Sequence, residues 1–322
     1  MTFWLSGQAF NPTVRKRIAV SLFVGVAASA TCLVKERATP NHPADFGLSW
    51  FGAQSLLRGE NPYARVGPGL EYDWPWPLVY PATAFVAAAP LTLLPRLEAT
   101  LVFVFISFGL LTYAITRDGW FRLPMFGSIA VISAAAVGQW SPLLTASLEL
   151  PWAGFFLAAK PTDGLAIAIG ARSKTRIWAL AGAAVLGLGS LALFPGWPLV
   201  WMRQLHYADI QMAPPLFRGG GFLILLALLR WRRPECRLLL ALAVIPQVGA
   251  WYTVVPLFMI PRNSRETMAL AALTSLAWLL QDRLVTATSE AELNAQVGAL
   301  IVAFAFLPCV WMILQRSLTS RT

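Results

Sequence analysis

The sequence predicts an all-α polytopic membrane protein. Of its 322 residues, 57% are hydrophobic and 12% are charged, and the mean hydropathy is +0.62. Soluble domains carry about 25% charged residues. Apolar runs near the ~20 residues that cross a bilayer recur along the whole chain. The clearest of them are 18–34, 98–115, 177–194, 238–260 and 297–314.

In chain order, these runs and weaker ones predict about nine to eleven transmembrane helices in one integral membrane domain, residues 1–322. The weaker runs are 78–94, 122–137, 141–158, 161–171, 217–229 and 267–282. The run 161–171 has 11 residues, which is too short to span at about 1.5 Å per residue. We therefore expect broken or re-entrant helices between 77 and 172. Such backbone survives at membrane depth where it is buried or lines a wet cavity.

Three basic clusters predict the orientation. They are Arg15, Lys16 and Arg17; Arg172, Lys174 and Arg176; and Arg230, Arg232, Arg233 and Arg237. By the positive-inside rule these clusters face the cytoplasm. Residues 36–77 and 195–216 then form two external loops, and the protein is expected in the inner (plasma) membrane with its site on the non-cytoplasmic side. The same rule accounts for the net charge of +10, so nucleic-acid binding is not expected.

The content of cysteine and histidine argues against disulfide and metal sites. Two of the three cysteines, Cys32 and Cys309, lie in apolar runs, and the number is odd. Two histidines, His42 and His206, are too few for a histidine-built metal site. We therefore expect no metal and no cofactor.

The first external loop contains a predicted interfacial helix at 45–58. Asp45 could cap its start, and Gly59 is a natural stop. Apolar residues along this stretch fit a helix that lies at the bilayer surface. Residues 197–211 have the same interfacial character on the same predicted side.

Asp45 is the leading candidate for chemistry. A carboxylate at the mouth of a membrane helix could act as a general base that takes a proton from an acceptor hydroxyl. Glu71, Asp73 and Asp209 are alternative bases, and the plain alternative for Asp45 is a helix cap. Both roles can coexist, because a cap uses one carboxylate oxygen.

Lys160 is a candidate ligand for a lipid phosphate. A cation at membrane depth is costly and usually marks a paired or functional site. Pro161 breaks the helix after it and could free backbone groups for a ligand. The alternatives are a side chain that reaches a nearby surface and a structural pair with Asp163.

Three further polar residues are candidate substrate ligands. Gln139 could hydrogen-bond a sugar hydroxyl or a phosphate oxygen, although counting spans places it on the cytoplasmic side, opposite Asp45. Arg203 and His206 lie in the second external loop and could bind phosphate. Ordinary loop or interfacial positions are the alternatives for all three.

The sequence also lacks the motifs of nucleotide-dependent enzymes. It has no Gly-rich phosphate loop, no DxD metal motif and no soluble domain that could hold a nucleotide sugar. If a sugar is transferred, the donor should itself be lipid-linked. Lysine or arginine at the membrane surface could then hold the leaving phosphate.

A series of short motifs resembles glycosyltransferase family 87, of the GT-C superfamily. The motifs are Asp45, the run Ala53-Gln54-Ser55-Leu56-Leu57-Arg58-Gly59-Glu60-Asn61-Pro62-Tyr63, then Tyr80-Pro81, Ala89-Pro90-Leu91, Gly138-Gln139 and Lys160-Pro161. The resemblance covers 45–176. Ala82 stands where the family often has a second proline, and no Asn-Ser pair is found near 210–220.

The resemblance implies a GT-C-like helix bundle with interfacial helices in its external loops. It also implies inverting transfer of a mannose-like hexose or a pentose from a polyprenyl-phosphate sugar donor to a lipid or glycan acceptor, among membrane lipids. Asp45 would be the base, and Lys160 would contact the donor phosphate. Arg58, Asn61, Tyr63 and Tyr80 join Gln139, Arg203 and His206 as expected substrate-binding residues.

Two alternatives from other functional classes remain open. A non-catalytic GT-C-like subunit or assembly factor would keep the fold and bind a membrane-protein partner. A transporter of a lipid-linked intermediate should show charged residues inside several spans and two related halves, and apart from Lys160 the sequence shows neither.

Overall fold

The computed structural model describes residues 12–74, 77–207 and 212–316. The described chain is mainly helical, with two short strands, as the sequence predicted. The α-helices are α1 (Val14–Ala38), α2 (Phe46–Leu57), α3 (Ala82–Ala88), α4 (Arg96–Ile115), α5 (Ile129–Ala136), α6 (Ser141–Ala146), α7 (Pro161–Gly170), α8 (Ser173–Leu193), α9 (Trp197–Tyr207), α10 (Pro234–Val244), α11 (Ser264–Leu284), α12 (Glu290–Ile301) and α13 (Leu307–Leu314).

Shorter elements connect these helices. The 3₁₀ segments are η1 (Pro62–Ala64), η2 (Ala89–Leu93), η3 (Leu123–Gly127), η4 (Pro151–Ala159), η5 (Pro215–Phe217), η6 (Gly221–Arg230) and η7 (Trp251–Met259), and η8 (Val302–Phe306) is a π-helical turn between α12 and α13. Two short parallel strands, β1 (Val66–Gly67) and β2 (Tyr72–Asp73), lie in the first predicted external loop.

Four helices of the described chain are long and apolar enough to cross a membrane. They are Val14–Ala38, Arg96–Ile115, Ser173–Leu193 and the continuous Glu290–Leu314. They coincide with the predicted spans 18–34, 98–115, 177–194 and 297–314. Two shorter apolar helices, Ala82–Leu93 and Gly221–Arg230, occupy the predicted spans 78–94 and 217–229.

Of the remaining predicted spans, 267–282 lies within the single helix α11 and 161–171 forms α7, whereas the other three are divided. Residues 122–137 form η3 and α5, 141–158 form α6 and η4, and 238–260 divide into α10 and η7. Pro151 and Pro246 lie at two of these interruptions. Proline has no amide hydrogen to donate within a helix, so a helix tends to end before it. Broken helices are therefore present between 77 and 172, as expected. Of the nine to eleven transmembrane helices predicted, four helices among the described residues are long and apolar enough to cross a membrane.

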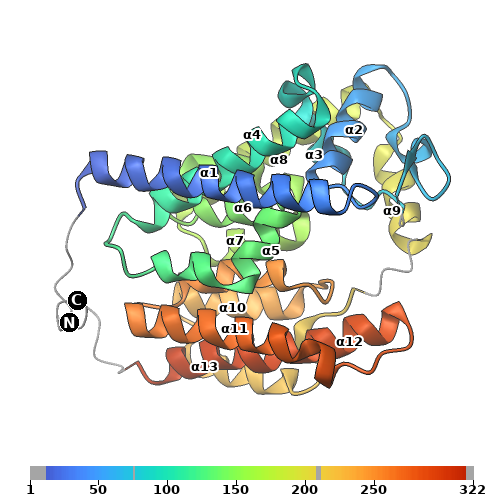
Figure 1. The fold of residues 1–322 in the computed structure, drawn as a ribbon. Coiled ribbons are helices and arrows are strands. Elements are labelled where there is room, and N and C mark those ends of the chain that lie inside the picture. The colour runs from blue at the N-terminus through green and yellow to red at the C-terminus, as the bar shows by residue number, and fades with distance from the viewer. Residues whose placement is uncertain (1–11, 75–76, 208–211, 317–322) are drawn as a thin grey trace.

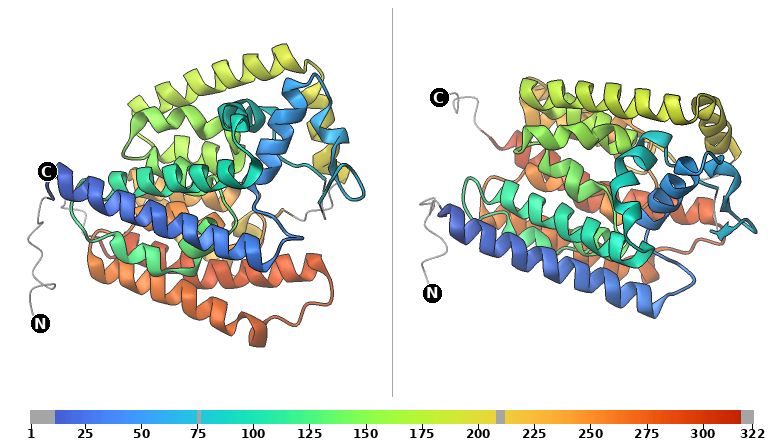
Figure 2. Two further views of the ribbon diagram at one scale, coloured as in Figure 1. Left: turned by 45° about the horizontal axis from the view of Figure 1, so that its top comes forward. Right: turned by 90° about the horizontal axis from the view of Figure 1, so that it is seen from above.

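The helices pack in layers. In Figure 1, α10, α11 and α13 form the lower layer, and α5, α6 and α7 lie above them. Seen from above, α1 and α8 lie on opposite sides of the molecule, with α4 packed along α1 and η4 along α8 (Figure 2). The short helices α2, α3 and α9 gather at one end of the bundle, at the right in Figure 1. The candidate site lies at this end.

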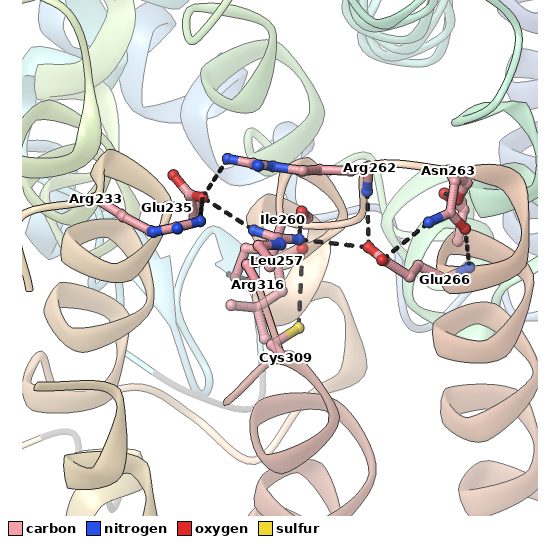
Figure 3. Close-up of polar contacts among 10 residues, drawn as sticks. Arg233, Glu235, Leu257, Ile260, Arg262, Asn263, Glu266, Cys309 and Arg316 are labelled. Atoms are coloured by element: carbon pink, nitrogen blue, oxygen red, sulfur yellow. Dashed lines mark hydrogen bonds and ion pairs between the residues drawn. The ribbon is translucent and has the colours of Figure 1, made fainter. Parts of the chain in front are cut away.

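A charged cluster holds the last helices together near the opposite end. The Glu235 carboxylate lies 2.8 Å from Arg262, 3.0 Å from Arg316 and 4.0 Å from Arg233 (Figure 3). Arg316 also lies 3.4 Å from Glu266, and its side chain is 8% exposed. The cluster therefore joins α10, α11 and the residues that follow α13.

The close packing of α8 on η4 depends on glycine. A Cβ atom at Gly182 would overlap the carbonyl group of Phe155, whereas a Cβ at Gly187 in the same helix would meet nothing within 4 Å. We predict that Gly182→Ala lowers the melting temperature in detergent, at a cost of about 1–3 kcal/mol from overpacking. Gly187→Ala should leave it unchanged or raise it, because alanine favours a helix by about 1 kcal/mol. Equal melting temperatures for the two variants would contradict this packing.

Candidate functional site

Asp45 is held in place by its backbone at the start of α2. Its amide nitrogen donates a hydrogen bond of 2.7 Å to the carbonyl of Val137. The preceding residue, Ala44, donates its amide hydrogen to the carboxylate of Glu36, which forms a 3.0 Å ion pair with Arg96. These contacts tie the turn between α1 and α2 to α4 and to the end of α5.

The side chain of Asp45 does not cap α2. It accepts a hydrogen bond from the amide nitrogen of Gln139 instead. The amide oxygen of Gln139 in turn accepts a 3.1 Å hydrogen bond from Lys160 Nζ. Gln139, which is 2% exposed, therefore links the two leading candidate residues directly.

The predicted position of Gln139 on the side opposite Asp45 is wrong. That position came from counting spans alone, and only the broken helices expected between 77 and 172 could bring the two residues together. In the structure α5 ends at Ala136, and Gly138 has a left-handed φ of 61°. Glycine adopts this conformation without the steric cost of a Cβ. The chain therefore turns back and delivers Gln139 to the start of α2.

Lys160 lies between η4 and α7 and has several partners. Its ammonium is 3.1 Å from Asp163 Oδ2, 3.4 Å from Ser141 Oγ and 4.9 Å from the centre of the Tyr252 ring. Ser141 also donates a 2.6 Å hydrogen bond to the same Asp163 oxygen. The predicted alternative of a structural pair with Asp163 is thus present in the structure.

Asp45 and Lys160 line one cavity of about 440 Å³. The wall comes from the start of α2, the segment before α3, the start of α7, α9, the segment before η7 and α12. Its apolar lining includes Trp74, Val79 and Trp201. Tyr80, also predicted as a site residue, lines the same cavity and is 8% exposed.

Burial dominates the electrostatics of this cavity. It raises the pKa of Asp45 from an ordinary value of 3.8 to about 6, against the opposing effects of Lys160, Lys35 and Gln139. A carboxylate that titrates near pH 6 is suited to proton transfer near neutrality.

Three predicted site residues lie outside the cavity lining and shape the adjacent loop instead. The Tyr63 hydroxyl donates a 3.1 Å hydrogen bond to the carbonyl of Tyr80. The Asn61 side chain accepts a 3.0 Å bond from the amide of Tyr63 and thereby caps η1. Arg58 is exposed and lies 3.5 Å from Glu60.

Arg203 and His206 are also absent from the lining. They are exposed on α9, whereas Trp201 and Leu205, one helical turn apart, face the cavity. Two side-chain bonds fix this helix on η1 and on the segment before α3. Trp201 Nε1 donates to the carbonyl of Val79 at 2.8 Å, and Gln204 donates to the carbonyl of Tyr63 at 3.1 Å. Residues 208–211, in the second predicted external loop, and 75–76, in the first, lie outside the described residues.

The residues on the cavity wall opposite Asp45 were not predicted from the sequence. Gln247 and Tyr252 line the cavity from the segment that was predicted to be part of the span 238–260. A glutamine between Pro246 and Gly249, inside an apolar run, was the available signal. Helix breakers beside a buried polar group indicate irregular backbone at a cavity.

No family model, curated protein or solved structure matches this chain. Cys32, Cys236 and Cys309 are free and buried. Among the residues that the structure describes, no group of three or more histidine, cysteine, aspartate or glutamate side chains could hold a metal ion.

The raised pKa of Asp45 predicts a pH-dependent effect of Asp45→Asn on stability. A folded-state pKa of about 6 against 3.8 means that folding favours the protonated carboxyl, and this contribution is lost as the pH rises through 6. The melting temperature of the variant relative to wild type should therefore increase between pH 4.5 and 7 and then level off. A difference that does not change with pH would contradict the buried position of this carboxyl. Asp73→Asn, on the exposed loop, is the control.

Proposed function

We propose that this protein is a membrane glycosyltransferase that moves a sugar from a polyprenyl-phosphate donor to a lipid or glycan acceptor. The proposal depends on one observation above all. Asp45 and Lys160, a base and a cation, line the same cavity and are joined through Gln139. This is the juxtaposition that the motif resemblance requires.

The reaction can be written on these residues. Asp45 takes the proton of an acceptor hydroxyl as that oxygen forms a bond to the anomeric carbon. The bond from this carbon to the phosphate oxygen breaks, and the phosphate leaves with the electron pair. Attack opposite the leaving group inverts the configuration. Lys160 stabilises the negative charge on the phosphate as it leaves.

The surroundings of the site favour a lipid-linked donor. A cavity of about 440 Å³ lies within the ~300–1,000 Å³ range of small-molecule sites. Trp74, Val79 and Trp201 give it an apolar wall that suits the first isoprene units of a polyprenyl chain. In this proposal the chain crosses the plasma membrane several times, with GT-C-like architecture and the cavity on the non-cytoplasmic side.

One observation favours a second candidate function. The Lys160 ammonium is already neutralised by Asp163 at 3.1 Å, and a second carboxylate, Asp45, lines the same cavity. An excess of carboxylates disfavours a phosphate anion. A non-catalytic GT-C-like subunit that keeps the fold and binds another membrane protein would need no phosphate at Lys160.

We predict that Asp45→Asn abolishes sugar transfer and leaves the protein folded. Loss of a general base lowers rates about 10²–10⁴-fold. The measurement uses purified full-length protein, radiolabelled polyprenyl-phosphate mannose and an extracted lipid acceptor. Asp73→Asn is the matched control, because this exposed carboxylate lies on the same loop and does not line the cavity.

Full activity of Asp45→Asn would exclude Asp45 as the base. If the wild type binds the donor but transfers no sugar to any acceptor tested, the non-catalytic candidate is favoured. Loss of activity in Asp73→Asn as well would point to a general effect on the loop rather than to catalysis.

The orientation is tested by labelling single cysteines in a background without Cys32, Cys236 and Cys309. Cysteines at Ala64 and Arg203, both exposed near the cavity end, should react with an impermeant maleimide applied to intact cells. A cysteine at exposed Lys174 should react after permeabilisation, because its basic cluster is expected in the cytoplasm. The reverse pattern would place the cavity on the cytoplasmic side.

A further inference from the structure

Two buried acceptor oxygens on the cavity wall lack hydrogen-bond partners among the described residues. They are Oδ1 of Asp163 and Oε1 of Gln247. Asp163 is 1% exposed and Gln247 is 4% exposed, and both line the cavity. A buried acceptor without a donor is costly, so native structures seldom keep one without a ligand or water to satisfy it.

Each of these side chains uses its other polar atom inside the protein. Asp163 Oδ2 receives Lys160 at 3.1 Å and Ser141 Oγ at 2.6 Å. Gln247 Nε2 donates to the carbonyl of Leu242 at 3.3 Å. Both side chains are thus anchored, and each has one acceptor left.

Hydrogen bonds of the Gln247 backbone, rather than of its side chain, hold this segment in place. Its amide and carbonyl exchange hydrogen bonds of 3.3 and 3.2 Å with Ala213, and its carbonyl also accepts from Arg218. The position of this segment therefore does not depend on Oε1. That atom has no partner among the described residues.

The chemistry of the two acceptors selects a neutral donor. A metal cation or an ammonium ligand at Asp163 would meet the Lys160 charge on the same carboxylate. A phosphate would bring its own acceptor oxygens against both atoms. A hydroxyl group has neither defect, because it donates a hydrogen bond without carrying charge.

We propose that Asp163 and Gln247 form a hydroxyl-binding subsite that receives the sugar ring of an amphiphilic glycoside. The ring hydroxyls donate to Asp163 Oδ1 and Gln247 Oε1, and the attached chain lies along Trp74 and Trp201. This deepens the proposed function and rests on it for the identity of the natural ligand. The subsite itself is a binding property that does not require catalysis.

The test measures binding of two octyl glucosides to the full-length protein in amphipol by native mass spectrometry. One probe is octyl β-glucoside, and the other is its O-permethylated counterpart, which keeps the chain and ring but has no hydroxyl donors. We expect the first probe to bind about tenfold more tightly. Gln247→Met should weaken its binding about three- to tenfold, the usual effect of one lost hydrogen bond.

One variant serves as a control. Gln54→Met removes an amide of α2 that does not line the cavity, and it should retain glucoside binding. The subsite is overturned if Gln247→Met binds octyl β-glucoside within about twofold of wild type, if both probes bind equally, or if sodium ions compete with the glucoside.

Failure of this inference differs from failure of the proposed function. The wild type could transfer no sugar and still bind the glucoside, with binding lost in Gln247→Met. The subsite would then stand and the proposed enzyme activity would not. If the protein is an active transferase and Gln247→Met binds the glucoside as the wild type does, the proposed activity stands and the subsite does not.

Discussion

The candidate site depends on the two hydrogen bonds of the Gln139 amide. One end of the amide donates to Asp45 and the other accepts from Lys160, so a single buried side chain connects α2 to the junction of η4 and α7. Carboxylate and ammonium are held on one wall without direct contact. A direct ion pair would stabilise charged Asp45 and lower its pKa, whereas the neutral spacer lets burial raise it.

The broken helices in the middle of the chain make this arrangement geometrically accessible. Gly138 turns the backbone after α5, and Pro161 begins α7 directly after Lys160. Continuous helices would have carried Gln139 and Asp45 to opposite ends of the bundle. The long apolar helices α1 and α8 lie on opposite sides of the molecule, with these broken segments between them (Figure 2). Irregular backbone is tolerated at membrane depth where protein buries it.

Hydropathy was sufficient to predict the all-helical class and the four long spans, because about 20 apolar residues in a row leave few alternatives. Asp45 and Lys160 were found because isolated charges stand out in an apolar chain. Counting spans placed Gln139 opposite Asp45, because it assumes that each apolar run crosses completely, and only the expected broken helices left their contact open. Gln247 and Tyr252 were missed because nothing in their local sequence tells which distant segment they face.

The helix α9 covers one side of the cavity and is attached through main-chain carbonyls. Trp201 and Gln204 donate to the carbonyl groups of Val79 and Tyr63, which every residue type would supply at those positions. The position of α9 is therefore expected to persist when the side chain of Val79, which lines the cavity, is replaced. In evolution or in directed selection, a substitution of Val79 can change the shape of the cavity while the hydrogen bonds that attach α9 stay in place.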